Sequence, residues 1–145
     1  MIQPMKNTIY KVCSGGVIYH DGKVLTIKWL SRNTIEFPKG TMEEGETKEA
    51  TCIREVFEET GYKTKIIKSL GKVVFEFDHD DNHYNKTVHQ YLLELASSNE
   101  PTPQREEHED FEDLWLTLKE AAEQLTFNSD IEVLNRAEQS IKLAY

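Results

Sequence analysis

The sequence contains little cysteine and no long apolar run. Only two of its 145 residues are cysteine, Cys13 and Cys52, and they lie far apart in the chain. Two separated cysteines cannot form a disulfide framework or a cysteine-based zinc site, so we interpret both as small core residues in a reducing compartment. No stretch approaches the ~18 apolar residues of a membrane-spanning helix, and the N-terminal residues lack the apolar segment of a signal peptide. These absences predict a cytoplasmic protein that does not contact membranes.

Positive charge is also scarce. The chain has 17 Lys and Arg against 26 Asp and Glu, a formal net charge of −9. A protein that coats nucleic acid carries a basic stripe, so general nucleic-acid binding is not expected. Small anionic substrates remain compatible with this charge, because a bound metal ion reverses the local sign. With two Trp, six Tyr and six Phe available for a core, the composition is that of a globular protein and not of a disordered one.

Turn residues divide the chain into the short strands of a mixed α/β fold. Asp21-Gly22 lies between two apolar runs and predicts a two-residue hairpin. Pro38 follows a short apolar run and ends the strand before it. The predicted strands are residues 10–19, 23–29, 35–37, 64–78, 86–96 and 114–116, and the predicted polar loops are residues 40–46, 79–85 and 97–110. We expect one domain whose sheet is covered by helices.

One helix is predicted in the middle of the chain and two near its C-terminal end. Thr47 can cap the first helix, and Gly61 can end it because glycine accepts a left-handed backbone. Within this helix, Ala50, Ile53 and Phe57 recur at helical spacing and are predicted to face the core. The two later helices are predicted at residues 117–125 and 129–143.

The first helix is also predicted to carry a strongly acidic face. Glu55, Glu58 and Glu59 stand at positions i, i+3 and i+4, on one side of a helix. Carboxylates this close repel one another, and a divalent cation with oxygen ligands would offset that repulsion. Arg54 can hold a neighbouring carboxylate in a fixed direction, and Glu46, eight residues earlier, is within its reach. The alternative is a solvated acidic face with ordinary ion pairs.

Residues 40–62 as a whole resemble the signature of the Nudix hydrolase family, G-x5-E-x7-R-E-U-x-E-E-x-G-U, where U is a bulky aliphatic residue. The positions that match are Gly40, Glu46, Arg54, Glu55, Val56, Glu58, Glu59 and Gly61. Only Tyr62 departs from the pattern, and we expect it to pack as the aliphatic residue does. The order of predicted elements is similar to that of the family over residues 8–142. The resemblance implies a single Nudix domain there, an α/β/α sandwich with a mixed β-sheet between helices.

The resemblance implies a pyrophosphohydrolase that cleaves a nucleoside diphosphate linked to another moiety and depends on a metal ion. By this likeness, Glu55, Glu58 and Glu59 bind the metal together with the backbone carbonyl of Gly40. Arg54 orients one glutamate of the set, most directly Glu55. Mg²⁺ is the expected ion because phosphates and carboxylates are hard oxygen ligands. Mn²⁺ would bind the same site.

The general base is left open between two regions of the chain. In some members of the family a glutamate of the signature takes the proton, which here indicates Glu55 with Glu58 as a further catalytic carboxylate. In others the base comes from a distant acidic loop, which residues 106–110 resemble. Glu107 fits this role if two residues are inserted before Trp115, and Glu109 fits without a gap. A solvated acidic run is the alternative for both.

The substrate is expected to be a small nucleotide with a polyphosphate. The sequence Pro38-Lys39-Gly40 resembles the family groups that cleave diadenosine polyphosphates, diphosphoinositol polyphosphates or mRNA caps. Lys39, as a lysine at the mouth of the site, and Lys86 are expected to contact phosphates. Aromatic side chains that could stack on a base are Tyr84, His83 and Phe127. The absence of a long basic tract favours a dinucleoside polyphosphate such as diadenosine tetraphosphate.

Other functions remain open on the same fold. The substrate could instead be a (d)NTP, ADP-ribose, an RNA 5′ end or a diphosphoinositol polyphosphate. A catalytically silent nucleotide-binding module and an acidic protein-interaction domain are the non-enzymatic alternatives. The intact acidic trio favours an enzyme, because a binding module has no reason to keep three repelling carboxylates. The oligomeric state is not predicted.

Overall fold

The computed structural model describes residues 6–97 and 110–144. Its centre is a seven-stranded sheet whose main path runs β3-β2-β1-β6-β5, with β4 paired to β1 and β7 paired to β2. The strands are β1 (Asn7–His20), β2 (Lys23–Trp29), β3 (Thr34–Glu36), β4 (Lys39–Thr41), β5 (Thr64–His79), β6 (Asn82–Leu95) and β7 (Phe111–Thr117). The helices are α1 (Lys48–Thr60), α2 (Leu118–Gln124) and α3 (Asn128–Ala144).

β1 organises the sheet because it pairs with three other strands. It runs parallel to β6 over residues 7–18, and antiparallel to β2 and β4. The remaining strand pairs are antiparallel, so the sheet is mixed, as expected. The predicted hairpin between β1 and β2 is confirmed, with Asp21 and Gly22 both at positive φ, 53° and 80°.

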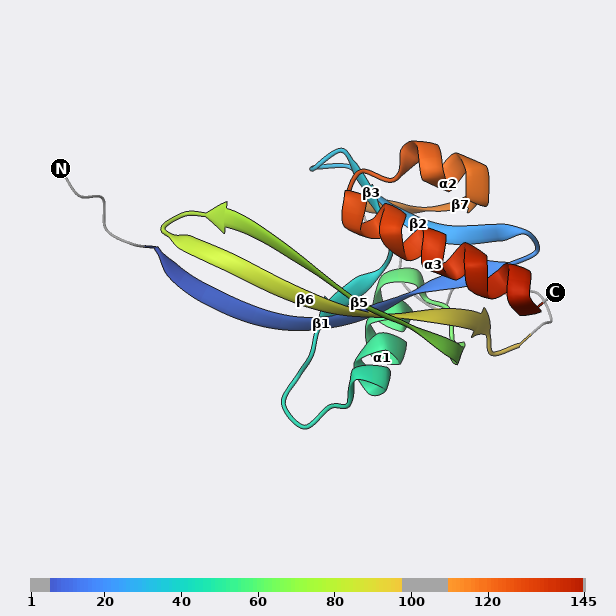
Figure 1. Cartoon of the computed structure of the whole chain (residues 1–145), viewed down its shortest axis with the longest axis horizontal. Helices are drawn as coiled ribbons and strands as arrows, with labels where there is room; N and C mark the ends of the chain where they lie inside the picture. The colour runs from blue at the N-terminus through green and yellow to red at the C-terminus, as the bar shows by residue number, and fades with distance from the viewer. Residues whose placement is uncertain (1–5, 98–109, 145) are drawn as a thin grey trace.

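Helices cover both faces of this sheet, α1 on one side and α2 and α3 on the other (Figure 1). Alternation along β1 separates two cores. Val17 packs in the cluster that contains the buried residues of α2 and α3, whereas Ile18 packs with Cys52 and Val56 of α1. The fold is therefore the expected α/β/α sandwich with a mixed sheet between helices. Within the described ranges, no helix is long and apolar enough to cross a membrane.

The ends of α1 confirm two predicted caps. The Thr47 hydroxyl accepts a hydrogen bond from the Ala50 N–H at 3.1 Å. At the other end, Gly61 adopts φ 78°, and its N–H donates to the Phe57 carbonyl at 2.7 Å. These caps satisfy backbone groups that a helix cannot pair internally, so the helix length follows from local sequence.

The buried face of α1 differs from the predicted apolar stripe. Ala50 is exposed, and Ile53 and Phe57 are only partly buried. The residues that α1 buries are Thr51, Cys52, Val56 and Thr60. The two threonine hydroxyls donate to carbonyls one turn earlier, at 3.0 and 2.6 Å. The prediction was wrong because apolar spacing does not reveal a threonine that becomes buried once the helix backbone accepts its hydroxyl hydrogen.

Three boundaries also differ from the prediction. The segment predicted as a loop at residues 79–85 continues both strands of a hairpin, and the turn is confined to residues 80–81. Residues 39–41 form β4 because they pair with β1 across residues 13–15. Residues 111–117 form a longer last strand because they pair along all of β2. The last two differences arise from pairing with a strand distant in sequence, whereas the first arises from pairing within a hairpin.

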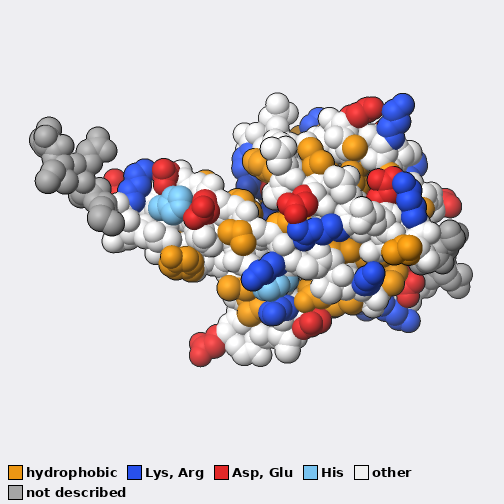
Figure 2. Space-filling view, viewed as in Figure 1, with side chains coloured by type: hydrophobic (Ala, Val, Ile, Leu, Met, Phe, Trp, Pro, Cys, Tyr) orange, Lys and Arg blue, Asp and Glu red, His pale blue; other side chains and the backbone are white. Residues whose placement is uncertain are grey.

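β1, β5 and β6 extend together beyond the helices as an arm (Figure 1). Acidic, basic and histidine side chains gather near its free end (Figure 2). There the Asp78 carboxylate lies 3.4 Å from Lys6 Nζ and 2.8 Å from His83 Nδ1. The contact between Asp78 and His83 joins two residues that are paired across β5 and β6.

Candidate active site

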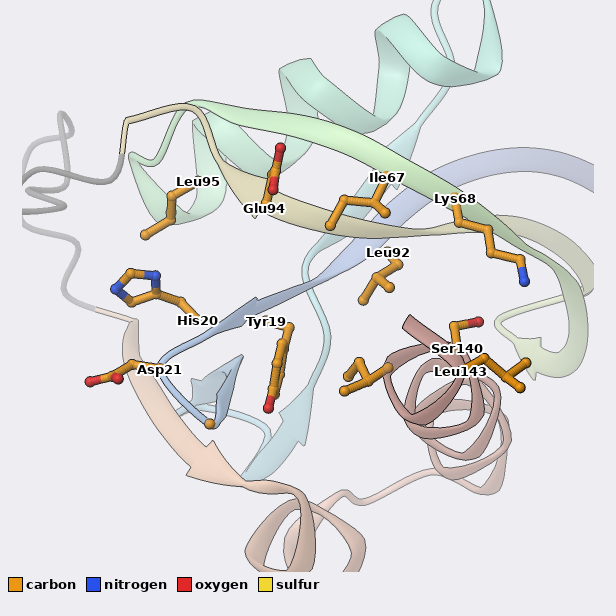
Figure 3. Close-up of a pocket in the computed structure, with 12 residues that line it drawn as sticks. Tyr19, His20, Asp21, Ile67, Lys68, Leu92, Glu94, Leu95, Ser140 and Leu143 are labelled. Atoms are coloured by element: carbon orange, nitrogen blue, oxygen red, sulfur yellow. The ribbon is translucent and has the colours of Figure 1, made fainter. Parts of the chain in front are cut away.

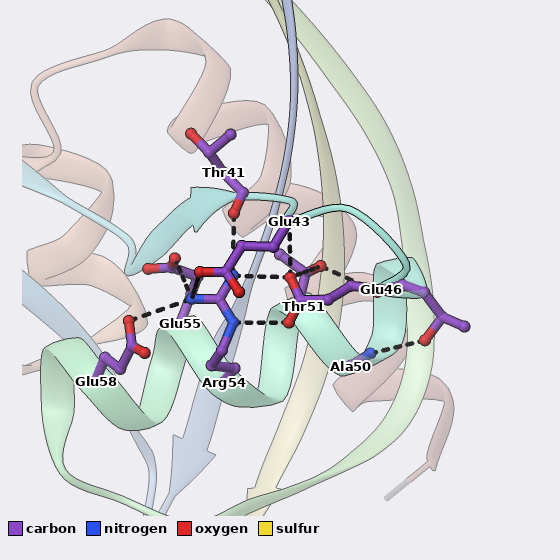
Figure 4. Close-up of polar contacts among 9 residues, drawn as sticks. Thr41, Glu43, Glu46, Ala50, Thr51, Arg54, Glu55 and Glu58 are labelled. Atoms are coloured by element: carbon purple, nitrogen blue, oxygen red, sulfur yellow. Dashed lines mark hydrogen bonds and ion pairs between the residues drawn. The ribbon is translucent and has the colours of Figure 1, made fainter.

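Arg54 is the centre of a polar network on the acidic face of α1 (Figure 4). Its Nε and Nη2 donate to the two carboxylate oxygens of Glu46, at 2.7 and 2.8 Å. Its Nη1 donates to Glu55 Oε1 at 2.7 Å, and Nη2 also donates to the Thr41 carbonyl at 3.1 Å. Such a bidentate contact fixes direction as well as distance. The predicted reach of Arg54 to both glutamates is confirmed.

Glu46 ties the loop before α1 to the helix itself. Besides Arg54, its carboxylate accepts hydrogen bonds from the Glu43 N–H at 2.8 Å and the Thr51 hydroxyl at 3.0 Å. The Arg54 guanidinium, helped by these donors, lowers the pKa of Glu46 to about 2. Glu46 therefore stays ionised over the working pH range, which suits an anchor and not a group that exchanges protons.

Gly40 of β4 lies directly against the carboxylate of Glu55. A Cβ atom added at residue 40 would stand 2.0 Å from Glu55 Oε2, far inside van der Waals contact. The requirement is one of space, because Gly40 is not among the glycines with positive φ. The pairing of Gly40 with Ser14 holds β4 at this position. The backbone of β4 and the acidic face of α1 therefore meet only because residue 40 lacks a side chain.

The three glutamates of the acidic face have different surroundings. The Glu55 side chain is 16% exposed, whereas that of Glu58 is 56% exposed and lies 3.3 Å from Arg54 Nη1. Burial raises the pKa of Glu59 to about 8; nearby Lys39 opposes this rise and Glu55 adds to it. Burial also raises the pKa of Glu55. Two of the three carboxylates thus lie where their own charge is disfavoured, unless a cation joins them.

The oxygen donors of these residues fit a divalent cation in their chemistry. Across residues 6–97 and 110–144, no three His, Cys, Asp or Glu side chains already converge as metal ligands. Arg54 Nη1 contacts both Glu55 and Glu58. The fit rests instead on the oxygen donors, the raised pKa of Glu55 and Glu59, and the close approach of Gly40. A hard cation prefers this donor set.

A small cavity of about 140 Å³ opens beside these carboxylates. Its lining residues are Cys13, Trp29, Arg32, Glu36, Phe37, Lys39, Gly40, Thr41, Glu59 and Lys86. The structure thus brings the predicted Lys39, Lys86, Gly40 and Glu59 to one cavity. The Lys86 Nζ lies over the rings of Phe75 and Phe77, 5.9 and 5.4 Å from their centroids.

Lys39 is less open than a lysine at the mouth of a site would be. Its side chain is 19% exposed, and its Nζ donates to Glu36 Oε1 at 3.1 Å. Burial alone would lower the pKa of Lys39, but Asp130 and Glu36 raise it above its ordinary value. Lys39 is therefore a charged side chain whose charge is already balanced within the protein.

The aromatic residues predicted to stack on a base do not line this cavity. Tyr84 stacks on Phe77 of the arm, with centroids 5.1 Å apart and planes 9° apart. His83 contacts Asp78 at 2.8 Å, and Phe127, 45% exposed, lies just before α3. The candidate bases Glu107 and Glu109 lie outside the described residues.

Four residues near the cavity were missed by the sequence reasoning: Trp29, Arg32, Glu36 and Asp130. Glu36 lies 3.6 Å from Arg32 and 3.1 Å from Lys39, so it joins two cations of the cavity. One signal could have found it, since a charged residue between two apolar ones in a short strand needs a partner. Arg32 carried no comparable signal, because its contacts come from the path of the loop.

A larger cavity of about 690 Å³ lies away from these residues (Figure 3). It is formed by the β1–β2 hairpin, the ends of β5 and β6, and the last turns of α3. Its walls include Tyr19, Leu92 and Leu143, with Lys68 and Glu94 as charged groups. None of the residues of the Arg54 network lines it, so size does not identify the site here.

Comparison with known proteins agrees with the family resemblance of residues 40–62. Residues 10–137 match the NUDIX domain. Over 105 residues the chain is 34% identical to a protein named ADP-ribose pyrophosphatase from Bacillus subtilis, covering 70% of this chain and 55% of that protein. The chain spans about half the length of the curated relatives it matches.

Solved structures share the fold at lower identity. A NUDIX hydrolase from Nitrosomonas europaea superposes with a TM-score of 0.73 at 20% identity, covering 90% of this chain and 89% of that one. An Ap4A hydrolase from C. elegans superposes with a TM-score of 0.70 at 18% identity, covering 92% and 99%. The matched family region, the relative at 34% identity and the geometry around Arg54 agree. The chain belongs to the NUDIX domain family.

Proposed function

We propose that this chain is a pyrophosphohydrolase that cleaves a nucleoside diphosphate linked to another moiety, with Mg²⁺ as its ion. The observation that carries this proposal is the Arg54 network, in which one guanidinium holds Glu46 and Glu55 at 2.7 Å each. Charged groups held in place before substrate binds need no reorganisation during the reaction. A divalent ion, when bound, supplies charge neutralisation for the phosphates and lowers the pKa of the attacking water.

The residues that would hold this ion are Glu55, Glu58, Glu59 and the backbone carbonyl of Gly40. Members of the family use divalent ions generally; Mg²⁺ suits carboxylate and phosphate oxygens, and Mn²⁺ would substitute for it. Arg54 is a positioning residue, because it acts through Glu55. Glu46 serves Arg54 in the same way, through the bidentate contact.

For the general base we propose Glu55, with Glu107 and Glu109 as the alternatives outside the described residues. Glu55 is partly buried, and Arg54 Nη1 holds its carboxylate in one direction at 2.7 Å, so this carboxylate is positioned before a proton has to be accepted. Glu55→Gln, Glu107→Gln and Glu109→Gln distinguish the three. The variant that removes the acidic limb of the pH profile of kcat identifies the base.

A dinucleoside polyphosphate is the proposed substrate class. Lys86 supports it, because no ion pair with this lysine is found in the part of the chain that the structure describes, which leaves its charge available for phosphate. Lys39, close by, adds a second cation that is partly balanced by Glu36. ADP-ribose is the second candidate, on the strength of the name of the Bacillus relative.

Product analysis with Mg²⁺ tests the proposal. The panel contains diadenosine tetraphosphate, ADP-ribose, 8-oxo-dGTP, a capped RNA and a diphosphoinositol polyphosphate. We expect diadenosine tetraphosphate to be converted to ATP and AMP faster than the others. Preferred cleavage of another compound replaces the substrate and keeps the reaction, whereas no cleavage of any compound with Mg²⁺ or Mn²⁺ favours a nucleotide-binding module.

Two variants of the acidic face test the metal assignment. Glu58→Gln and Glu59→Gln remove one charge each, and removal of a group that acts on transition-state charge costs ~10²-fold or more in kcat. Glu123→Gln, on the exposed surface of α2, is the matched control and keeps activity. The thermal midpoint of each variant shows whether the fold is kept. Normal hydrolysis by the Glu59 variant would show that the metal ligands are assigned wrongly.

A further inference from the structure

The cavity beside Glu59 has a flat, positively charged wall that the proposed chemistry does not use. Trp29, at the end of β2, and Arg32, in the following loop, form this wall together, and both line the cavity. The guanidinium carbon of Arg32 lies 4.3 Å from the centroid of the Trp29 ring. We propose that Trp29 and Arg32 form a platform that binds the base of a nucleotide.

Trp29 is held in place by the neighbouring strand. It pairs in register with Phe111 of β7, and the two ring centroids are 4.7 Å apart. Directly after it, the Leu30 N–H donates to the Asp110 carbonyl at 2.7 Å, and the Ser31 N–H donates to the Asp110 carboxylate at 3.1 Å. The platform therefore exists before a ligand binds, which reduces the entropy lost on binding.

The planar guanidinium of Arg32 contacts Glu36 along its edge and Trp29 on one face. Its Nη2 lies 3.6 Å from the Glu36 carboxylate, and its side chain is 55% exposed. A guanidinium forms ion pairs in its own plane and stacks through its two faces. Arg32 has one face over Trp29 and an edge toward Glu36, and no other contact of its guanidinium is found among the described residues, so we infer that its second face meets a ligand in the cavity. A planar cation presented in this way stacks on a purine or pyrimidine ring.

The position of the platform separates the base from the phosphates. Gly40 and Glu59 line the same cavity as Arg32, so a base on Arg32 directs its phosphates toward the acidic face of α1. Lys86 lines the cavity as well and contributes a charge for those phosphates. This inference rests on the proposed function in one respect, which is that the substrate is a nucleotide.

Binding of two matched ligands tests the platform without catalysis. AMP and ribose 5-phosphate differ only by the base, and their dissociation constants are measured by calorimetry on the intact chain. Since stacking of one base typically accounts for ~5- to 150-fold in affinity, we expect the unmodified protein to bind AMP at least ~10-fold more tightly than ribose 5-phosphate. In Arg32→Ala this ratio falls to near one, because AMP loses affinity and ribose 5-phosphate does not.

Two further variants complete the test. Lys65→Ala removes an exposed charge of β5 outside the cavity and keeps the ratio of the unmodified protein. Trp29→Leu removes the support of Arg32 and lowers the ratio in part. Thermal melting confirms that each variant is folded.

Three results would overturn the platform. They are equal affinity of the unmodified protein for the two ligands, an unchanged ratio in Arg32→Ala, and no measurable binding of AMP at millimolar concentration. Failure of the proposed function looks different. If the protein cleaves ADP-ribose and not diadenosine tetraphosphate while the ratio responds to Arg32→Ala, the substrate class changes and the platform stands.

Discussion

A missing side chain at residue 40 sets the distance between β4 and α1. A Cβ there would lie 2.0 Å from Glu55 Oε2. Glycine is therefore required at residue 40 because the Glu55 carboxylate needs the space, and not because the backbone has a positive φ. Gly45 and Gly61, by contrast, adopt φ of 84° and 78°, where glycine is favoured for its backbone freedom. Glycine is thus favoured at residue 40 because of steric space, and at residues 45 and 61 because of the backbone conformation.

Gly40→Ala should lower kcat by ~10²-fold while the fold is kept. The new methyl group displaces the Glu55 carboxylate from its contact with Arg54, and a misplaced catalytic group can cost ~10²-fold in rate. The backbone angles of residue 40 suit alanine, so we expect the thermal midpoint to change little. Steady-state kinetics and a melting curve check both expectations. Unchanged kcat would mean that the position of Glu55 does not matter for the reaction.

Arg54→Lys keeps the positive charge of the side chain but removes the planar guanidinium that donates several hydrogen bonds at once. A lysine cannot donate to both oxygens of Glu46 and to Glu55 at once, so Glu55 loses its fixed direction. We expect kcat to fall by ~10- to 100-fold with a smaller change in KM, as for loss of orientation. Arg136→Lys is the control, because Arg136 likewise donates several hydrogen bonds, to the carbonyls of Leu70 and Lys72, but lies on α3 away from the acidic face. Its effect should be confined to stability.

At the scale of elements, α3 begins with a buried carboxylate. Asp130 is 4% exposed, and burial raises its pKa to about 6, with Lys39 opposing the rise. In an unfolded chain the pKa of an aspartate is ~3.9. The folded protein therefore holds the proton more tightly than the unfolded chain, and the stability present at low pH is lost as the pH rises from about 4 to about 6.

Asp130→Asn should remove this part of the pH dependence. Relative to the variant, the free energy of unfolding of the unmodified protein should fall by about 2–3 kcal/mol between pH 4 and pH 7, since each pKa unit corresponds to ~1.4 kcal/mol. Urea unfolding of both proteins at the two pH values gives the difference. Glu123→Gln serves as a control with an exposed carboxylate. A difference that is the same at both pH values contradicts the prediction.

At the scale of the whole molecule, the sheet is unevenly covered. Around residues 88–93 β6 lies between the two cores, whereas the arm continues past the helices (Figure 1). Its exposed apolar side chains include Tyr10, Val74 and Phe77, at 74%, 51% and 37%. Segments with few buried contacts open at lower free energy than the core.

Hydrogen exchange should reflect this difference. We expect amides of residues 75–79 and 82–86 to exchange at least ~10-fold faster than those of residues 88–93, because opening of the arm exposes less apolar surface. Mass spectrometry of peptides from the two regions measures it. Equal protection along β6 would indicate that another chain covers the arm in solution.

Much of the site was predictable from sequence because its geometry is local. Glu55, Glu58 and Glu59 share a helix face through spacing alone, and Arg54 of α1 reaches Glu46, which lies only eight residues earlier in the loop before the helix. The caps and the first hairpin also depend on residues close in sequence. The predicted roles of Glu107 and Glu109 stay predictions.

Only the tertiary structure decided which of these groups are buried and what they face. Pairing of β4 with β1 brings Gly40 against Glu55, and the fold places Lys39 between Glu36 and Asp130. The stack of Arg32 on Trp29 depends on β7, which is far away in sequence. The sequence by itself determined the family and the acidic face of α1, since helix periodicity orders residues a few positions apart. Burial, partner charge and cavity walls come from long-range packing, which no local spacing encodes.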